Sequence, residues 1–463
     1  MRQRFVNLRI PDHGNDVREA EILVDGGRIV ALAAPADGDG GDEERIDLGG
    51  ALVLPGVIDG HVHFDDPGFT HRETFASGTR AAAAGGVSCV VDMPCTTLPP
   101  VTRGSALDNK LSVIRPKAHV DFMLWGGVCE NSMAEPDWRE HLREIAEAGV
   151  GSIKVYMLSG MDTFRDLGRE QLRAVLAEAA RLGVPVGVHA EDRELVHALT
   201  ERLRSAGRER PLDYAASRPA EAEINAVATM RQLCRETGAR VHIVHVGTGR
   251  ALDLIAGAKE EGLPMSGETC PHFLAFTDED LAAQGAVLKT APVVKSAADQ
   301  KRLWQGVASG ELDYVATDHA AGQWPEEKHT GSIWTDYGGV PGVELMLPYL
   351  YSEGVRKGRI TLERLVEVTA SAPARFFGIE RRKGRLAPGL DADLVVFDPD
   401  ETWTVRAGEL HNLNRYTPHE GQLLTGRVRA LYVRGRLAYQ RRAGGEHFAP
   451  PGTGEWVRRE SRC

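Results

Sequence analysis

The run VIDGHVH at residues 57–63 is the first of eight short apolar segments with the character of β-strands. The other seven are VSCVVDM (87–93), VDFMLWG (120–126), SIKVYM (152–157), VPVGVH (184–189), VHIVHV (241–246), PMSGETC (264–270) and DYVATDH (313–319). Helical patterns separate several of them, over 139–149, 169–183 and 219–238. Eight strands that alternate with helices predict an α/β protein built as a (β/α)8 barrel, the TIM-barrel architecture. A doubly wound sheet is the alternative, but no GxGxxG motif follows the first run.

The two ends of the chain show a different pattern of expected secondary structure from this central part. Residues 21–33 carry two apolar runs around Asp25-Gly26-Gly27, which is typical of a β-hairpin. After about residue 380, strands and turns return without helices between them. Because chain termini commonly lie close together, we predict that residues 1–54 and 380–463 form one small β domain beside a barrel over 55–379. A separate C-terminal domain is the alternative, and residues 450–463 are expected to form an exposed tail.

Composition limits the class of protein. The chain has 463 residues, 42% of them hydrophobic, and a formal net charge of −11, so a protein that binds the phosphate backbone of nucleic acid is not expected. No apolar run reaches the length of a membrane span, and the N-terminus lacks the apolar core of a secretory signal. The six cysteines form no CxxC pair, which favours reduced thiols. These features predict a cytoplasmic protein without membrane or nucleic-acid partners.

His61 and His63 are the sharpest local signal for chemistry. Residues two apart on a strand point to the same face, so both imidazoles can bind one cation, and neutral imidazole suits Zn²⁺. The alternative is a pair of histidines on a half-buried strand. In a barrel, however, functional groups gather where the strands end, and this pair ends the first strand. The position favours a metal site.

The later strand ends supply further polar groups. Lys154 lies between Ile and Val, where a buried ammonium is unfavourable unless it pairs with an acid or reaches solvent, or unless CO₂ converts it to a carbamate anion. His245 is preferred over His242 as a ligand because residues three apart face opposite sides of a strand. The full set of candidate ligands is His61, His63, Lys154, His189, His245 and Asp318, whereas Asp92, His242, Cys270, His272 and His319 are interpreted as structural.

These motifs resemble the cyclic amidohydrolases of the binuclear-metal amidohydrolase superfamily, which include dihydroorotases, allantoinases and hydantoinases. The matching segments, in the order of that family, are GVIDGHVHFDDPG (56–68), GGVSCVVDMP (85–94), SIKVYM (152–157), VHAED (188–192), VHIVHVGTG (241–249), ETCPHF (268–273), ATDHA (316–320) and GRLAPGLDADLVVFD (384–398). The resemblance implies that the β domain formed by both termini is a β-sandwich. It also implies two divalent metal ions, with zinc favoured, held by the six candidate ligands, Lys154 as its CO₂-derived carbamate.

The resemblance further implies hydrolytic opening of a cyclic amide, imide or ureide by a hydroxide that bridges the two metals, with Asp318 carrying the proton to the departing ring nitrogen. Dihydroorotases hold the substrate carboxylate with an Arg and an Asn at positions where this chain has Asp65 and Cys95. Hydantoinases place a Tyr where this chain has Ser159. Allantoinases, which act on a neutral ureide, fit better, and Ala291 and Gly339 are expected to contact the ring by position.

Four alternatives stay open at this stage. Hydantoinase- or dihydropyrimidinase-type hydrolysis and dihydroorotase activity differ from the first prediction in substrate only. A mononuclear deaminase on the same barrel would leave Lys154 without a role, and a catalytically silent scaffold protein would be expected to lose ligands that are all present here. Relatives suggest that the small-molecule hydrolase assembles as a homodimer or homotetramer.

Overall fold

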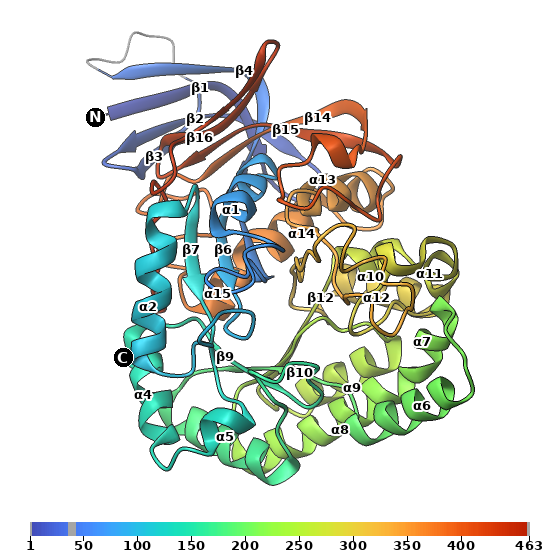
Figure 1. The fold of residues 1–463 in the computed structure, drawn as a ribbon. Coiled ribbons are helices and arrows are strands. Elements are labelled where there is room, and N and C mark those ends of the chain that lie inside the picture. Colours follow the sequence, from blue (N-terminus) through green and yellow to red (C-terminus); the bar gives the residue numbers. More distant parts are fainter. Residues whose placement is uncertain (1, 36–42, 461–463) are drawn as a thin grey trace.

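The computed structural model describes residues 2–35 and 43–460 (Figure 1). Its centre is a barrel of parallel strands in which each predicted apolar run forms a strand. These are β5 (Val57–Val62), β6 (Val87–Asp92), β7 (Asp121–Leu124) with its continuation β8 (Gly126–Gly127), β9 (Ile153–Tyr156), β10 (Val186–His189), β11 (Val241–Ile243), β12 (Met265–Thr269) and β13 (Tyr314–Val315). The prediction of a (β/α)8 barrel is confirmed.

Two sheets make up the wall of the barrel, β5-β6-β7 and β8 to β13, and every neighbouring pair is parallel. They meet on one side through a bridge between Val62 and His319, which brings the first and last strands together. On the other side β7 and β8 are one strand interrupted at Trp125, whose N–H donates to the carbonyl of Asp92 at 2.9 Å. The closed wall directs all carboxyl-terminal strand ends to one face of the barrel.

Helices cover the outside of the barrel. The longer ones are α1 (Phe75–Ala84), α2 (Gly104–Ile114), α4 (Trp138–Ala148), α5 (Arg169–Leu182), α6 (Arg193–Ser205), α8 (Ala220–Thr237), α9 (Gly249–Glu260) and α12 (Ala297–Ser309). The short ones are α3 (Glu130–Met133), α7 (Pro211–Ser217), α10 (Pro271–Ala275), α11 (Asp278–Gln284), α13 (Met346–Tyr349), α14 (Leu362–Val366), α15 (Ala372–Phe377), the 3₁₀ turns η1 (Arg115–Lys117), η2 (Gly285–Leu288) and η5 (Ala407–Glu409), and the π-helical turns η3 (Leu350–Val355) and η4 (Glu367–Ser371).

The three helices expected from sequence are α4, α5 and α8, each followed by a glycine in the left-handed conformation, with φ of 95° at Gly149 and 67° at both Gly183 and Gly238. A residue with a Cβ would be strained at these helix ends, which explains why the glycines mark the boundaries so well.

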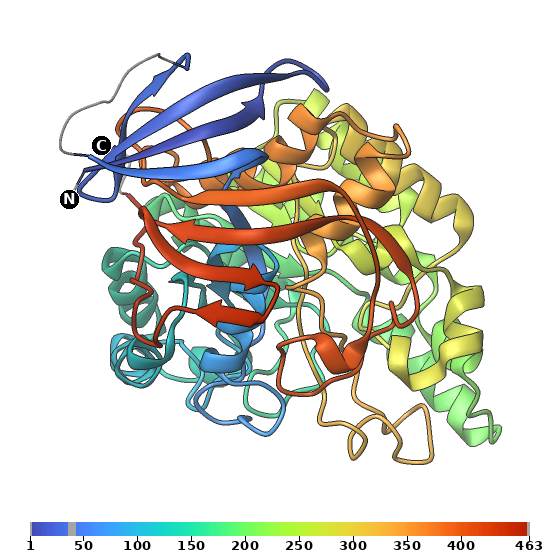
Figure 2. The ribbon, with the colours of Figure 1, turned by 90° about the horizontal axis from the view of Figure 1, so that it is seen from above.

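Both ends of the chain contribute to one eight-stranded mixed sheet. Its order is β17 (Gly445–Phe448), β16 (Arg436–Arg442), β15 (Leu423–Val433), β14 (Leu394–Thr404), β4 (Glu44–Pro55), β1 (Arg2–Pro11), β2 (Val17–Asp25) and β3 (Arg28–Ala33). Figure 2 shows the N-terminal strands beside the C-terminal ones. The sheet curls into a sandwich, because Phe5 of β1 packs edge-on against Tyr432 of β15 with ring centroids 5.0 Å apart although two strands separate them. The exact division at residues 54/55 and 379/380 stays a prediction.

A buried charge network joins this β domain to the barrel. The Nζ atom of Lys383 lies 2.8 Å from Asp121, at the start of β7, and 2.6 and 3.1 Å from Asp393 and Asp391, which precede β14. The side chain of Lys383 is 1% exposed. One ammonium therefore compensates carboxylates from both parts of the molecule. Asp121 and Asp391 also pair with Arg434 and Arg382, so the removal of Lys383 would chiefly leave Asp393 without a cation in this buried junction.

A second junction lies at the other side of the β domain. The imidazole of His411 lies between Glu344, which precedes α13, at 3.0 Å and Glu446 of β17 at 2.7 Å. Burial opposes the charged imidazolium, but these two carboxylates prevail and raise the pKa of His411 to about 9.

The last residues differ in part from the expected exposed tail. Over the part that the structure describes, Pro450, Pro451 and Arg458 are exposed, but Gly454 and Val457 are buried. Val457 is 1% exposed, its N–H donates to the carbonyl of Phe122 at 2.8 Å, and the N–H of Arg459 donates to the carbonyl of Gly149 at 3.0 Å. The segment fills the space between the starts of β7 and β9, so its backbone groups find partners there. Residues 461–463, which belong to the same prediction, lie outside the described residues.

Two further predictions can be compared with the described residues. Five cysteines are free and buried, namely Cys89, Cys95, Cys129, Cys234 and Cys270. Across residues 2–35 and 43–460, none of the helices has the length and apolar character needed to cross a membrane.

Candidate metal centre and active site

A cavity of about 510 Å³ opens at the face of the barrel where the strands end. Its floor carries five of the six predicted ligands, and its upper wall is formed by α6, α7 and the segments around residues 289–291 and 334–338. The lining includes His61, His63, His189, His245, Asp318, Arg72, Tyr156, Arg218, Lys289, Ala291, Tyr337 and Gly338. The cavity therefore combines imidazoles and a carboxylate with several cationic and aromatic side chains.

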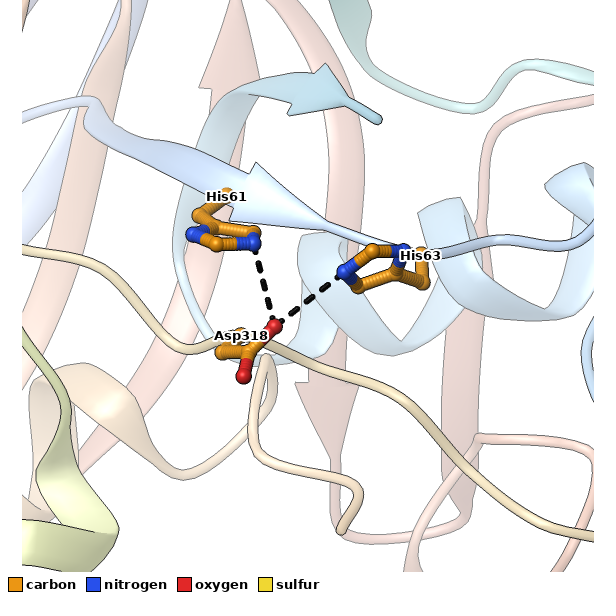
Figure 3. Close-up of side chains that lie close together, drawn as sticks. All are labelled: His61, His63 and Asp318. Atoms are coloured by element: carbon orange, nitrogen blue, oxygen red, sulfur yellow. Dashed lines mark ion pairs between the residues drawn. The ribbon is translucent and has the colours of Figure 1, made fainter. Parts of the chain in front are cut away.

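One half of the floor is a compact cluster of His61, His63 and Asp318 (Figure 3). The Oδ1 atom of Asp318 lies 3.0 Å from Nε2 of His61 and 3.2 Å from Nε2 of His63. The two imidazoles come from the end of β5, and the carboxylate follows β13 on the adjacent side of the barrel. Burial disfavours the carboxylate charge, yet the two histidines hold the pKa of Asp318 well below its usual range.

The other half is formed by His189, His245 and Lys154. The Nδ1 atom of His189 faces Nε2 of His245 at 3.0 Å, and the ring of His245 lies 5.5 Å from that of His61. Lys154 lies on β9 with 0% exposure, and its Nζ is 4.8 Å from the centre of the Tyr156 ring. Burial lowers the pKa of Lys154. The structure thus brings all six predicted ligands to one end of the barrel interior.

Buried carboxylates orient two of the histidines from behind. Glu268 on β12 lies 2.6 Å from Nδ1 of His61 with one oxygen and 3.2 Å from Nε2 of His242 with the other. Glu191 lies 2.8 Å from Nε2 of His189 and also pairs with Arg218. Such outer carboxylates fix the ring orientation and the tautomer of ligand histidines, so that the free nitrogen is the unprotonated one.

The backbone at two of these residues is held in the left-handed region. His245 has φ of 43° and Asp318 has φ of 49°, which ends β11 and β13 earlier than their apolar runs predicted. Non-glycine residues are rare in this conformation, and it persists only where the surroundings impose it. Asp318 is held by its neighbour His319, whose Nδ1 accepts the N–H groups of Gly342 and Val343 at 3.1 and 3.3 Å.

The same histidine is tied to the rest of the barrel mouth. Because Nδ1 of His319 accepts two hydrogen bonds, its proton is on Nε2, which donates to Glu73 at 3.2 Å. Glu73 is fully buried and also accepts the N–H of Leu413 at 3.2 Å, a contact that spans most of the chain. The sequence reading of His319 as a structural residue fits this arrangement.

The donor set fits divalent metal ions. Nε2 of His61 and Nζ of Lys154 are buried without a hydrogen-bond partner. The facing nitrogens of His189 and His245 can share at most one proton, and Asp318 adds a negative charge between two imidazoles. Buried polar atoms without partners are rare in native proteins, and imidazole with carboxylate is a donor set that suits zinc and its neighbours.

The four predicted substrate contacts lie in different places. Ala291 lines the cavity, and Cys95 lies behind it with Sγ 3.2 Å from the hydroxyl of Tyr156. Asp65 is fully buried, with its pKa raised well above the usual range by desolvation. Gly339 is occupied by protein partners, since its N–H donates to the carbonyl of Lys289 at 2.9 Å, while its neighbour Gly338 lines the cavity.

Sequence reasoning missed several residues of the site. Glu268 and Glu191 received no role, although a Glu inside the apolar run 264–270 is a signal that a buried partner exists. Arg218 and Lys289 lie on helical and irregular segments away from the strand ends, where no periodicity distinguishes them. Only the fold shows that these segments cover the metal ligands.

Comparison with known proteins gives a consistent result. Residues 52–438 match the profile of the "Amidohydrolase family". An "Allantoinase" of Rubrobacter xylanophilus is 40% identical, over 94% of this chain and 96% of the relative. An "L-hydantoinase" of Paenarthrobacter aurescens is 34% identical, over 96% and 95% of the two chains. The solved structure "L-Hydantoinase (Dihydropyrimidinase) from Arthrobacter aurescens" has a TM-score of 0.93 at 33% identity and covers 99% of this chain and 100% of that one.

Proposed function

The chain belongs to the amidohydrolase family, and from this premise we propose that it opens the ring of allantoin, a neutral cyclic ureide, by hydrolysis. Ring hydrolysis at a C–N bond of a cyclic amide is the activity that its allantoinase and hydantoinase relatives indicate. The observation that carries the proposal is the convergence of His61, His63, His189, His245 and Asp318 at one cavity. The buried Nζ of Lys154 lies against Tyr156 of the same lining and lacks a hydrogen-bond partner.

Two divalent metal ions, with zinc favoured, would be held by these six residues. When bound, such ions supply a water molecule of lowered pKa and polarise the carbonyl of the scissile bond. Lys154 as a neutral amine offers one donor, whereas its CO₂-derived carbamate offers two oxygens and a negative charge. Nζ has no hydrogen-bond partner that would compete with this modification. The pKa lowered by burial favours the neutral amine, which would attack the carbon of CO₂ and lose a proton to give the carbamate.

Asp318 is the residue placed to move protons. Its carboxylate lines the cavity, and the neighbouring imidazoles keep it ionised, so that it can accept a proton from the attacking water and pass it to the departing ring nitrogen. Its rigid left-handed backbone keeps the carboxylate in one place during both transfers. The barrel strands contribute the remaining ligands, and the upper wall excludes water above them.

A neutral substrate is favoured by the charges of the wall. Arg72 is bound to Glu327 through three contacts of 2.7–3.0 Å, and Arg218 is paired with Glu191. Both guanidinium groups are therefore neutralised by a carboxylate of the protein, which weakens their attraction for a substrate carboxylate. Asp65 stands where dihydroorotases have an arginine, and it is buried with a raised pKa. Ala291 and the backbone at Gly338 and Gly339, together with Asp65 and Cys95 behind them, form the proposed substrate wall.

Hydrolysis of a hydantoin or a dihydropyrimidine is the second candidate. The observation in its favour is the structural match of 0.93 in TM-score over nearly the whole chain to an L-hydantoinase. The reaction is the same, and the substrates differ in the groups attached to the ring and, for a dihydropyrimidine, in ring size. We also propose a cytoplasmic enzyme, in line with five buried free thiols, that forms a homodimer or homotetramer.

A substrate panel tests the proposal. Metal-loaded protein is assayed with allantoin, hydantoin, dihydrouracil and dihydroorotate, and allantoin is expected to give the highest kcat/KM. A strong preference for dihydroorotate would overturn the argument from the paired arginines.

Metal analysis tests the reaction class. About two ions per chain are expected, with fewer in Lys154→Ala and no change in Lys357→Ala, an exposed lysine paired with Glu353 on a π-helical turn. One ion per chain would indicate the mononuclear deaminase, and none would indicate the scaffold protein.

A further inference from the structure

Lys328 is a buried cation for which the proposed reaction has no use. It lies in the segment after the last barrel strand, and its side chain is 0% exposed. Within the described residues no carboxylate lies within ion-pair distance of its Nζ, and desolvation together with the nearby charge of Lys289 lowers its pKa to about 7. An unpaired buried ammonium is unfavourable, so its surroundings have to compensate it.

Backbone carbonyls provide this compensation. Nζ of Lys328 donates to the carbonyl oxygens of Tyr337 at 2.9 Å, Gly339 at 2.7 Å and Lys289 at 3.4 Å. All three ammonium protons are therefore used. Their acceptors belong to two segments that are far apart in sequence, one at Lys289 and the other at Tyr337 and Gly339. The ammonium also lies 5.5 Å from the centre of the Tyr416 ring, which adds a cation–π contact.

Gly339 is the point at which these contacts meet. Its carbonyl accepts hydrogen bonds from Lys328 and from the hydroxyl of Tyr416 at 3.2 Å, and its N–H donates to the carbonyl of Lys289 at 2.9 Å. The hydroxyl of Tyr416 accepts the N–H of Gly322 at 2.9 Å. Tyr416 belongs to the connection between β14 and β15, so the β domain reaches the barrel mouth here.

The segments that Lys328 joins are the two walls that would contact the ring. Ala291 follows Lys289 by two residues, and Gly338 lies between the two carbonyls held at Tyr337 and Gly339; both line the cavity. A Cβ built on Gly338 would lie 3.8 Å from the Cβ of Ala291, so the two walls touch. Donation to the Tyr337 carbonyl also polarises its peptide group, whose N–H belongs to Gly338 and becomes a stronger donor.

We propose that Lys328, supported by Tyr416, is a positioning residue for substrate recognition, which fixes the peptide groups of 289–291 and 337–339 against the ring of the bound cyclic ureide. This inference rests on the proposed function, because it assigns the recognition of a ring rich in carbonyl and N–H groups to these two walls. The proposed metal ligands lie on or after barrel strands, and the hydrogen bonds of Lys328 are made to other residues, namely Lys289, Tyr337 and Gly339. Loss of the Lys328 contacts therefore weakens substrate binding more than it slows the chemical step.

Steady-state kinetics of Lys328→Met with allantoin test the inference. Methionine retains the length of the side chain but cannot donate a hydrogen bond. KM is expected to rise at least about tenfold, with kcat within about threefold and the metal content equal to that of the parent enzyme. Tyr416→Phe is expected to raise KM by a smaller factor, and the double variant to resemble Lys328→Met, because both groups act on the carbonyl of Gly339.

Lys259→Met is the matched control. Its Nζ also donates to a backbone carbonyl, that of Glu311 at 2.7 Å, but near the start of β13 and thus at the opposite end of the barrel. Unchanged KM in Lys328→Met, or a fall in kcat with loss of metal, would overturn the inference. If Lys328→Met does not fold, Tyr416→Phe decides by the same criteria.

A second readout separates this inference from the proposed function. Hydrogen–deuterium exchange over residues 334–345 is expected to accelerate in Lys328→Met relative to the parent protein and to stay unchanged in Lys259→Met. If the parent protein hydrolyses none of the four compounds, the proposed function fails, and unaccelerated exchange would independently overturn the clamping role of Lys328.

Discussion

Replacement of Asp318 by asparagine isolates the proton-transfer role of its carboxylate. The residue has φ of 49°, and asparagine is among the few side chains that tolerate this left-handed conformation, so the backbone is retained. The amide has nearly the same volume and can keep its oxygen beside His61 and His63. What disappears is the negative charge and the ability to accept a proton. The substitution therefore changes chemistry far more than structure.

The size of the effect follows from the role. A positioned general acid–base group typically contributes 10²–10⁴-fold, so kcat for ring opening is expected to fall about 10³-fold, which corresponds to about 4 kcal/mol of activation free energy. Asp318→Ala should in addition lower thermal stability by about 1–2 kcal/mol, because alanine lacks the tolerance of asparagine for positive φ.

The assay combines kcat for allantoin with metal content and thermal melting for each variant, at saturating metal. Asp318→Asn with the parent metal content and kcat within tenfold of the parent value would refute the assignment of proton transfer to this residue. Equal stability of the asparagine and alanine variants would refute the argument from backbone strain.

Three further predictions concern the charge networks. Lys383→Met should lower the free energy of unfolding by about 3 kcal/mol, because the buried Asp393 loses its cation while Asp121 and Asp391 keep Arg434 and Arg382. Lys357→Met should change it by less than about 0.5 kcal/mol, because Lys357 is exposed; urea denaturation measures both, and equal effects would contradict the reasoning. The pKa of His411 is about 9, above its unfolded value near 6.5. Its protonation therefore stabilises the fold by up to about 3 kcal/mol, fully below pH 6.5, and this stabilisation is lost as the pH rises through 9. His411→Gln should remove this pH dependence of the unfolding midpoint, and a pH dependence that persists in the variant would exclude His411 as its source. Glu268→Gln should weaken metal binding about 10–100-fold in competition with a chelator, and an unchanged affinity would show that the orientation of His61 does not depend on this carboxylate.

The barrel and its ligands could be predicted from sequence because both depend on local patterns. Apolar runs of strand length and glycines at helix ends mark the elements, and in a barrel the polar residue that ends each run is placed at a common face. His189, at the end of its strand, is the simplest case. Asp318 lies three residues beyond its strand, yet the sequence predicts it because it closely follows the apolar stretch Tyr314-Val315-Ala316.

The remaining features depend on tertiary contacts that no local pattern encodes. The sequence predicts that Val457 lies in an exposed tail, because a single Trp-Val pair among polar residues gives no strand signal. In the structure its backbone N–H donates to the carbonyl of Phe122 on a barrel strand. The buried charge of Glu268 is explained only by its contacts with His61 and His242, which come from other strands. Lys328 lies in an irregular segment, where a lysine is ordinarily exposed, and only its three carbonyl partners reveal that it is buried.

Different contacts hold the residues proposed for catalysis and the segments proposed for substrate recognition. The proposed ligands lie on or directly after barrel strands. Buried carboxylates within the barrel orient His61 and His189, so these two rings are held without contacts from the β domain. The recognition wall is different, because Gly339 is held by Tyr416 and the mouth segment at Arg72 is held by Asn414, whose amide donates to the carbonyl of His71 at 3.0 Å. Both supporting residues come from the connection between β14 and β15. A change in that connection is therefore expected to alter substrate binding more than it alters the orientation of His61 and His189.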